Sequence, residues 1–463
     1  MDDSLDAVIL AAGKGTRMRS RRPKVLHSLI GLPLLEHVLR AARGISPARL
    51  AVVVSHGADE VRATFPGRDV VFVDQGEPRG TGHAVLAARE AVVSGTFLVL
   101  PGDVPLVPPD ALRALVRFHR EQQATISLLT MEPTDPGPYG RVVRGEDGRP
   151  LRIAEAGDAT PAERALCEVN SGIWCLENTP RLWRALANLS TSNAKGEFYL
   201  TDLVAVFSVA GKAAALCWPC VDDLRGVNDR RDLAQVEVFL RQRILAAWMR
   251  DGVTVVDPAA VYPSLDAAVG EDTILHPGTH LVGRTVIGEG CTVGPNAYLA
   301  DARIENGARV WYSVVEGAEI GPEATIGPYA HLRPGARIGA RAKVGNFVEV
   351  KEATLGDGVK AGHLAYIGDA EIGAGANIGA GAITCNFQPG KKGKFRTEVG
   401  PGAFIGSNAS LIAPIRIGEG AVVGAGSVIT HDVPPFALAL ERSPEMLKPR
   451  WARAKDEGGN DDG

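Results

Sequence analysis

One short N-terminal segment holds the residue types that a phosphate-binding site needs. An apolar run ends at Leu10-Ala11-Ala12-Gly13, and Arg17 and Lys24 follow it closely. A glycine turn lets backbone N–H groups approach a phosphate, and the two cations can neutralise triphosphate charge. The spacing does not match the dinucleotide-binding fingerprint, which needs a third glycine where Met18 stands, and it does not match the Walker loop. The segment predicts a phosphate-binding loop of another kind, with a solvated surface turn as the alternative.

A second candidate for chemistry is His363, within the segment KAGHLAYIGD. Neutral histidine can accept a proton near pH 7, so His363 is suited to act as a general base. Tyr366 follows closely, and a basic, non-repetitive segment at 384–398 comes about one repeat later. General-base catalysis requires no covalent intermediate, so Cys385 need not be a nucleophile. A lone histidine is more often a packed or surface residue, and that alternative stays open.

The N-terminal half must position the first site. Residues 1–228 alternate short apolar runs with helical patterns, which favours an α/β fold with a parallel sheet covered by helices on both faces. Ligands of such sheets bind beyond the carboxyl ends of the strands. Gly13, Gly57 and Gly102 end or follow strand-like runs. We therefore expect the phosphate site at that edge of a Rossmann-like sheet.

The C-terminal half follows a six-residue rhythm. An aliphatic residue recurs at Val269, Leu275, Leu281, Ile287, Val293 and Leu299, and 30 of the 54 glycines lie between 270 and 426. A helix cannot keep a period of six on one face, whereas coils of three flat sides can. The pattern predicts a left-handed parallel β-helix of hexapeptide repeats, with glycine at the corners. The segment 384–398 breaks the rhythm and should leave the coil as a loop.

These patterns predict three parts of the chain. They are an α/β domain at 1–228, a linker helix at 229–250, and a β-helix domain at 251–463 whose tail, 455–463, should be disordered. The net charge of −4 gives no reason to expect nucleic-acid binding, and no apolar run approaches the length of a membrane span. The acidic start does not fit a signal peptide, so we expect a cytoplasmic protein. The six scattered cysteines, including the pair Cys217 and Cys220, are interpreted as structural.

The segment LAAGKGTRMRSRRPKVLHSL, at 10–29, resembles the signature of nucleotide-sugar pyrophosphorylases along its whole length. Together with the β-helix pattern, the chain resembles the bacterial bifunctional N-acetylglucosamine-1-phosphate uridylyltransferase and glucosamine-1-phosphate N-acetyltransferase family. This resemblance implies acetylation of glucosamine 1-phosphate by acetyl-CoA in the C-terminal domain. It then implies UMP transfer from UTP to the product in the N-terminal domain, with release of pyrophosphate. The UDP-N-acetylglucosamine formed would feed peptidoglycan and lipopolysaccharide precursors. The family also implies Mg²⁺ and a homotrimer with shared coenzyme sites.

The resemblance assigns site residues in the first half. Arg17 and Lys24 would act on the triphosphate, and Asp103 and Asn228 would be the magnesium ligands, which suits hard oxygen donors. Pro101 stands where the family often has a tyrosine. The positions matching the family's UTP and sugar contacts are Leu10, Ala11, Ala12, Gly13, Lys24, Gln75, Gly80, Thr81, Gly102, Asp103, Gly140, Glu155, Asn170 and Asn228.

The resemblance also assigns residues in the second half. His363 would be the base for acetyl transfer, with Glu349 as a possible support, and one of Lys391, Lys392 and Lys394 would serve the coenzyme from the loop. Arg333 and Lys351 are one 18-residue coil apart and should stack as a phosphate clamp. The sugar-phosphate positions are Arg333, Lys351, Tyr366 and Asn377. The coenzyme positions are Ala380, Asn386, Phe387, Ser407, Ala425 and Arg442.

Three other functions are alternatives to a bifunctional enzyme. The chain could be a nucleotidylyltransferase with one reaction, whose β-helix is regulatory or only assembles subunits, but the number of coils, the basic loop and His363 favour a second site. A metal lyase like the γ-class carbonic anhydrases would need three histidines on zinc, and His276, His280, His331 and His363 are spread over several coils. The non-enzyme alternative is a purely structural trimerisation module.

Overall fold

The computed structural model describes residues 4–67, 69–441 and 443–449, so Arg442 and the tail at 455–463 lie outside the described residues. The chain forms two compact units, Met1–Arg243 and Ile244–Gly463. The boundary falls within the helix α8, Arg230–Arg250. Among the described residues, no helix has the length and apolar character needed to cross a membrane.

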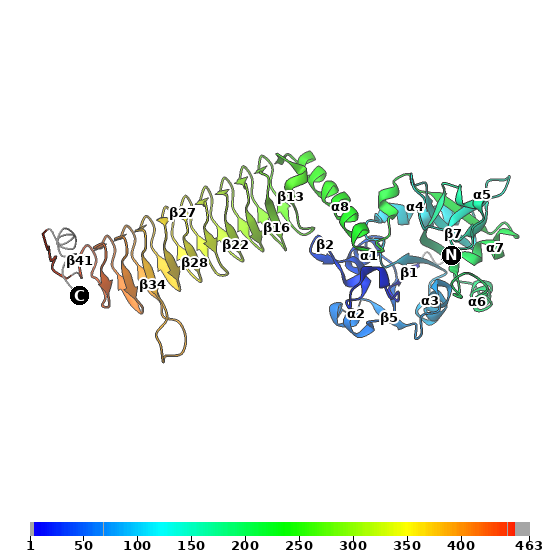
Figure 1. Cartoon of the computed structure of the whole chain (residues 1–463), viewed down its shortest axis with the longest axis horizontal. Helices are drawn as coiled ribbons and strands as arrows, with labels where there is room; N and C mark the ends of the chain where they lie inside the picture. The colour runs from blue at the N-terminus through cyan, green and yellow to red at the C-terminus, as the bar shows by residue number, and fades with distance from the viewer. Residues whose placement is uncertain (1–3, 68, 442, 450–463) are drawn as a thin grey trace, which may run out of the picture. The chain divides into compact units, whose positions relative to one another are not determined.

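A nine-stranded sheet forms the centre of the first unit, with the main order β11-β7-β10-β6-β1-β4-β5 (Figure 1). β1 pairs in parallel with β4 and β6, as the alternating pattern predicts. β10 runs antiparallel to both β6 and β7, which the sequence pattern did not indicate. The strands are β1 (Leu5–Leu10), β4 (Arg49–Val54), β5 (Val71–Asp74), β6 (Thr96–Pro101), β7 (Ile126–Met131), β8 (Arg141–Arg144), β9 (Pro150–Ala154), β10 (Val169–Glu177) and β11 (Ala213–Cys217).

Helices bury both faces of this sheet. Along β1, Ala7 and Ile9 belong to one apolar core and Val8 to the other, because successive side chains of a strand point to opposite faces. Residues of α1 and α4 pack in the first core, and residues of α3, α6 and α7 in the second. The helices are α1 (Leu34–Arg43), α2 (Ala58–Thr64), α3 (Thr81–Ala87), α4 (Pro109–Glu121), α5 (Pro161–Arg164), α6 (Pro180–Ala187) and α7 (Leu203–Ser208). The doubly covered α/β sheet is confirmed.

The second unit is a parallel β-helix with three faces (Figure 1). Face 1 runs from β12 (Thr254–Val255) to β41 (Leu438–Ala439), face 2 from β13 (Val261–Tyr262) to β40 (Val428–Ile429), and face 3 from β14 (Ala268–Val269) to β38 (Ile415–Ile417). Up to β39, each strand that continues a face pairs in parallel with the strand three further along, so each of these coils contributes once to every face; at the end of face 1, β39 pairs with β41. The six-residue rhythm is therefore confirmed as a β-helix.

The aliphatic residues of the rhythm point into the coils. Leu275, Val293 and Val310 follow one another in register on face 1, and all three are fully buried. The corners leave little room for side chains. A Cβ added to Gly339 would lie 2.6 Å from the backbone nitrogen of Asp357 in the next coil, so a larger residue would push the coils apart. Periodic aliphatic burial and corner glycines thus come from the same stacking.

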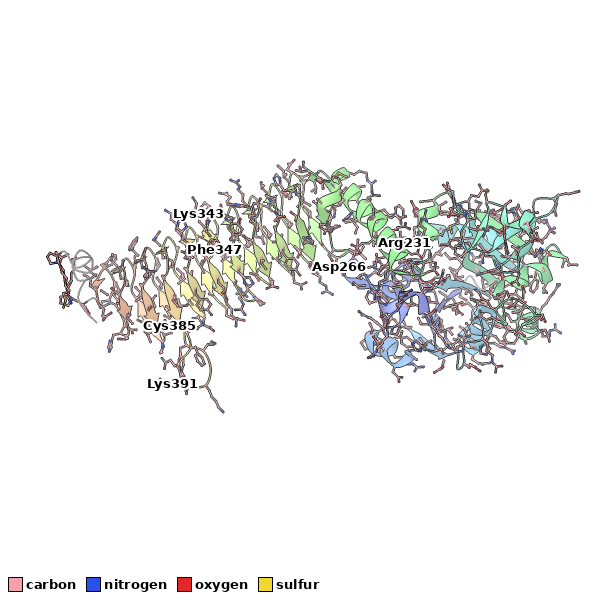
Figure 2. The ribbon with its side chains drawn as sticks, in the orientation of Figure 1. Arg231, Asp266, Lys343, Phe347, Cys385 and Lys391 are labelled. Carbon is pink, nitrogen blue, oxygen red and sulfur yellow. The ribbon has the colours of Figure 1, made fainter. Side chains whose placement is uncertain are left out.

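One segment leaves the coils as predicted. β34 (Ile383–Cys385) and β35 (Thr397–Val399) still belong to the coils, so the projecting part is 386–396, shorter than the predicted 384–398. Figure 1 shows this loop standing out from the stacked strands, and Figure 2 marks Lys391 on it and Cys385 at its base.

Candidate active sites

A cavity of about 600 Å³ opens at the carboxyl ends of the central strands of the first unit. β1 and β6 are neighbours, with Leu10 opposite Pro101, and the backbone N–H of Gly102 donates to the carbonyl oxygen of Leu10 (2.9 Å). The phosphate loop and the Gly102-Asp103 turn therefore leave the sheet side by side. The predicted contacts that line the cavity are Leu10, Ala12, Gly13, Gln75, Gly80, Thr81, Asp103, Glu155 and Asn170. Ala11, Gly102 and Gly140 lie beside this lining.

The two predicted cations hold the two predicted metal ligands. Lys24 forms an ion pair with the carboxylate of Asp103, and Nη2 of Arg17 donates to Oδ1 of Asn228 (2.8 Å). Gly15 allows the loop to pass over Lys24, because its φ is +59° and an added Cβ would lie 2.7 Å from Cβ of Lys24.

The backbone brings the predicted metal ligands to one place. The N–H of Val227 donates to the carbonyl oxygen of Asp103 (2.8 Å), and the N–H of Asn228 donates to the carboxylate of Asp232 (2.8 Å). One carboxylate and one amide oxygen, each already in contact with a cationic group, are the donor set that Mg²⁺ takes when phosphates and water fill its other positions. The residues present therefore fit a magnesium ion.

The predicted sugar contacts gather on another side of the cavity. The N–H of Asn170 donates to the carbonyl oxygen of Gly140 (2.9 Å), which joins two predicted contacts. Oγ1 of Thr201 donates to the Glu155 carboxylate (2.9 Å), and burial raises the pKa of that carboxyl above its ordinary value. Thr201 lies in no recognisable sequence motif and was not predicted. Only its contact with Glu155, 46 residues away in the same chain, reveals it. A polar group shielded in this way is suited to the hydroxyl and amide groups of a sugar.

The substitution at position 101 is compatible with the cavity. Pro101 lines it, and a Cβ added to Gly172 would lie 2.9 Å from Cγ of the proline ring. The side chain therefore gives the cavity an apolar wall beside Asp103, where the resemblance leads one to expect a tyrosine.

On the β-helix, the predicted phosphate clamp lies on face 2. Nη1 of Arg333 donates to Oε1 of Glu349 (2.8 Å), and Glu349 stands in register with Tyr366 on the next strand. Nδ2 of Asn386 donates to the Tyr366 hydroxyl (3.2 Å). The strands involved are β25 (His331–Leu332), β28 (Glu349–Lys351) and β31 (Tyr366–Gly368). Within one chain Glu349 therefore contacts Arg333.

His363 lies on the neighbouring face. It is the last residue of β30 (Lys360–His363) on face 1, is exposed, and stands in register with Asn346. Leu364 and Ala365 form the corner that separates it from Tyr366 on face 2. Asn377, on β33 (Asn377–Ile378), is also on face 1, opposite Lys360. The predicted acetylation residues thus occupy two faces that meet at one corner.

The predicted coenzyme residues continue along this corner. The strands before it stay in register over successive coils, with Ala361 opposite Ile378, Ile378 opposite Ile405, and Ile405 opposite Val423. Two positions beyond these aliphatic residues lie His363, Ala380, Ser407 and Ala425, which form one row that we call the corner row. Backbone hydrogen bonds join its coils, for example from Asn408 N–H to the Ala380 carbonyl oxygen (2.7 Å).

The loop contributes the remaining predicted residues that the structure describes. Phe387 is exposed at the base of the loop, with Nζ of Lys394 4.9 Å from the centre of its ring. Lys391 lies over Phe395 instead, with Nζ 5.6 Å from the ring centre. Of the three candidate lysines, Lys394 is the one held beside a predicted coenzyme contact.

Two other expectations can be compared with the geometry. The six cysteines are free, and Cys217 and Cys220 are exposed. In the part of the chain that the structure describes, no group of three or more His, Cys, Asp or Glu side chains could hold a metal. Within one chain, His280 stacks on Tyr262 and His331 contacts Glu316.

Comparisons with known proteins agree with this architecture. The model of the MobA-like NTP transferase domain matches residues 7–193, and the bacterial transferase hexapeptide model matches 266–301, 317–352 and 396–431. The bifunctional protein GlmU of Halalkalibacterium halodurans is 44% identical over 97% of this chain and 99% of its own. The GlmU proteins of Brevibacillus brevis (44%, 97% of each chain) and of an Exiguobacterium species (46%, 96% of this chain and 99% of its own) are similar over the same span. An NTP-transferase unit followed by a hexapeptide β-helix, matched from end to end, places this chain in the GlmU family of bifunctional enzymes.

Proposed function

We propose that the chain makes UDP-N-acetylglucosamine by acetylating glucosamine 1-phosphate and then joining the product to UMP from UTP. The observation that carries the proposal is the cavity at the ends of β1 and β6, which Asp103, Glu155 and Asn170 line. Lys24 contacts Asp103 there, and Arg17 contacts Asn228. The corner row with His363 supports the acetylation step. We further propose a cytoplasmic enzyme, since UTP and acetyl-CoA are drawn from that compartment.

In uridylyl transfer, the sugar-phosphate oxygen bonds to the α-phosphorus of UTP, and the bond to the β-phosphate oxygen breaks as pyrophosphate leaves with the electron pair. Asp103 and Asn228 would hold Mg²⁺, which when bound neutralises phosphate charge. The chain's own part is positioning and charge. Lys24 lies where it can pass from Asp103 to the arriving triphosphate, and Arg17 can do the same from Asn228.

In acetyl transfer, the amine nitrogen attacks the thioester carbonyl carbon, and the carbon–sulfur bond breaks as the coenzyme thiolate leaves. Neutral His363 accepts the proton that the amine gives up. Arg333 and Lys351 hold the phosphate of the sugar, and Tyr366 and Asn377 hold the sugar itself. The corner row leads away from His363, which is where an extended coenzyme would lie with its acetyl group at the histidine.

We propose that this site is completed by a second copy of the chain in a homotrimer. His363 and the Arg333 clamp lie on different faces of one chain. Large apolar side chains are exposed at the same corner in four successive coils: Tyr312, Tyr329, Phe347 and Leu364, the last two about 60% exposed. Figure 2 marks Phe347 among them. Face 3 carries ion pairs between successive strands, as in Arg416 with Glu398. The apolar corner is therefore the side that another subunit would cover.

The test is product analysis with glucosamine 1-phosphate, acetyl-CoA, UTP and Mg²⁺, leaving out one component at a time. Without acetyl-CoA, no sugar nucleotide should form unless N-acetylglucosamine 1-phosphate is supplied. Without UTP, acetylated sugar phosphate should accumulate. If acetyl-CoA were not consumed in the presence of glucosamine 1-phosphate, the β-helix would have no acetyltransferase role and the proposal would be wrong in its first step.

A further inference from the structure

Gln75 lines the cavity of the first unit with its amide nitrogen fully engaged. It follows β5, is almost completely buried, and lines the cavity. Its Nε2 donates to the carbonyl oxygen of Gly80 (3.1 Å) and contacts Nδ1 of His83 (3.1 Å). An amide nitrogen has two hydrogens, so these two contacts use both. Among the described residues, no hydrogen bond reaches Oε1, which leaves this oxygen for a ligand.

The orientation of this amide follows from its neighbours. The carbonyl oxygen of Gly80 can only accept, so a reversed amide would bring two oxygens together. The amide nitrogen can only donate, so Nδ1 of His83 must accept, and the ring must be neutral with its proton on Nε2.

The supporting elements are themselves held in place. His83 lies in the first turn of α3, half-buried, with its ring centre 6.4 Å from that of Phe198. The backbone N–H of Gly82 donates to the carbonyl oxygen of Phe198 (2.8 Å), and the N–H of Phe198 donates to that of Arg79 (2.8 Å). Two backbone hydrogen bonds to Phe198 therefore hold the start of α3 in place, and they fix the position of His83 as an acceptor.

We propose that His83 is a positioning residue that makes the site select uracil over cytosine. The inference rests on the proposed uridylyltransferase activity and adds to it a residue that need not touch the nucleotide. With both hydrogens of Gln75 engaged, the cavity presents an acceptor, Oε1, to the base. Uracil offers a donor, N3–H, to such an oxygen. Cytosine offers an acceptor at N3, so its lone pair would face the lone pairs of Oε1.

The test compares UTP with CTP in the full chain, using kcat/KM for nucleotide transfer to N-acetylglucosamine 1-phosphate. His83→Phe keeps a ring but removes the acceptor, which frees one hydrogen of Gln75 and loosens the amide. We expect the preference for UTP over CTP to fall by about tenfold, the size of one lost hydrogen bond. The loss should appear in KM for UTP, with little change in kcat. His83→Asn, whose side-chain oxygen can accept from Gln75, should keep most of the preference.

The kcat with UTP and the thermal unfolding of the same preparations show whether the first unit of each variant is folded, because the acetyltransferase rate reports only on the second unit. Wild-type preference in His83→Phe would overturn the inference and leave the proposed function intact. Equal loss in His83→Asn and His83→Phe would also overturn it, because the ring's packing against Phe198 would then be the cause. A wild-type chain that transferred neither nucleotide would overturn the proposed function together with this inference.

Discussion

At the level of single residues, the cations of the proposed nucleotide site contact its two proposed metal ligands. Lys24 contacts Asp103 and Arg17 contacts Asn228. Each contact satisfies a group that would otherwise lie in a half-buried cleft with its charge or dipole unpaired. When a nucleotide binds with Mg²⁺, the phosphates can replace Asp103 and Asn228 as partners of the cations, and Mg²⁺ can replace the cations as the partner of these two ligands. Metal and nucleotide binding should therefore be strongly coupled.

The two activities should separate at single positions. Asp103→Ala removes the carboxylate of the proposed metal site, so uridylyl transfer should fall by at least about a thousandfold while acetyl transfer is unchanged. His363→Ala should do the reverse, with uridylyl transfer from supplied N-acetylglucosamine 1-phosphate retained. Separate assays of coenzyme release and pyrophosphate release measure both. Equal loss of the two activities in either variant would contradict the division between the units.

Lys24 should compete with metal in the absence of nucleotide. Lys24→Gln removes the ammonium group from Asp103, so free Mn²⁺, used as a probe for Mg²⁺, should bind roughly three- to tenfold more tightly. Electron paramagnetic resonance of unbound Mn²⁺ measures this without turnover. Asp103→Asn is the matched control and should abolish the gain. Unchanged or weaker Mn²⁺ binding in Lys24→Gln would show that Lys24 does not compete with the metal for Asp103.

At the level of elements, patterns that repeat within the chain were predictable and contacts between distant segments were not. The period of six determines which residues point inward on the β-helix, so its core and corners could be derived from residues such as Leu275 and Gly339. The antiparallel course of β10 could not, because an apolar run reads the same in both directions. His83 and Thr201 had no signal either, since their importance lies in contacts with Gln75 and Glu155.

The contact between α4 and β7 should make stability depend on pH. His119 on α4 is buried against Oγ of Ser127 (2.9 Å), and burial lowers its pKa to about 4. The folded chain keeps this ring neutral, whereas the unfolded chain takes up a proton near pH 6.5. The stabilisation is therefore complete above pH 6.5 and is lost as pH falls towards 4.

His119→Gln keeps a polar partner for Ser127 but cannot ionise in this range. Between pH 7.5 and 5, its free energy of unfolding should fall by about 1–2 kcal/mol less than that of the wild type. Urea unfolding at the two pH values gives the comparison, and the exposed His56→Gln serves as the control. Parallel curves for wild type and His119→Gln would contradict the assignment.

At the level of the whole molecule, each unit has an apolar core of its own, and each carries one proposed site. The proposed nucleotide cavity is lined entirely by residues of the first unit. The proposed acetylation residues of one chain, by contrast, are divided between two faces. The first activity should therefore need one copy of the chain, and the second should need its neighbour.

Mixing defective chains tests this difference. His363→Ala and Arg333→Ala should each lack acetyl transfer alone, but co-expressed chains should recover a fraction of the wild-type rate. In mixed trimers some sites receive an intact histidine from one subunit and an intact clamp from the next. A mixture of separately purified trimers that do not exchange subunits is the control and should stay inactive. No recovery on co-expression would place the complete site within a single chain.

The corner row also fixes the distances between the proposed coenzyme contacts of the β-helix. Neighbouring parallel strands are about 4.8 Å apart, so each coil moves the same corner by one fixed step, and Ala425 lies three steps beyond His363. The number of coils therefore determines the length of coenzyme that can lie along the corner. A whole coil inserted before Val310 would lengthen the protein and leave this spacing unchanged. The same coil inserted between His363 and Ala380 would increase the distance from the thioester to every later coenzyme contact. The coils before and after the corner row can therefore change in number during evolution, whereas those within it cannot.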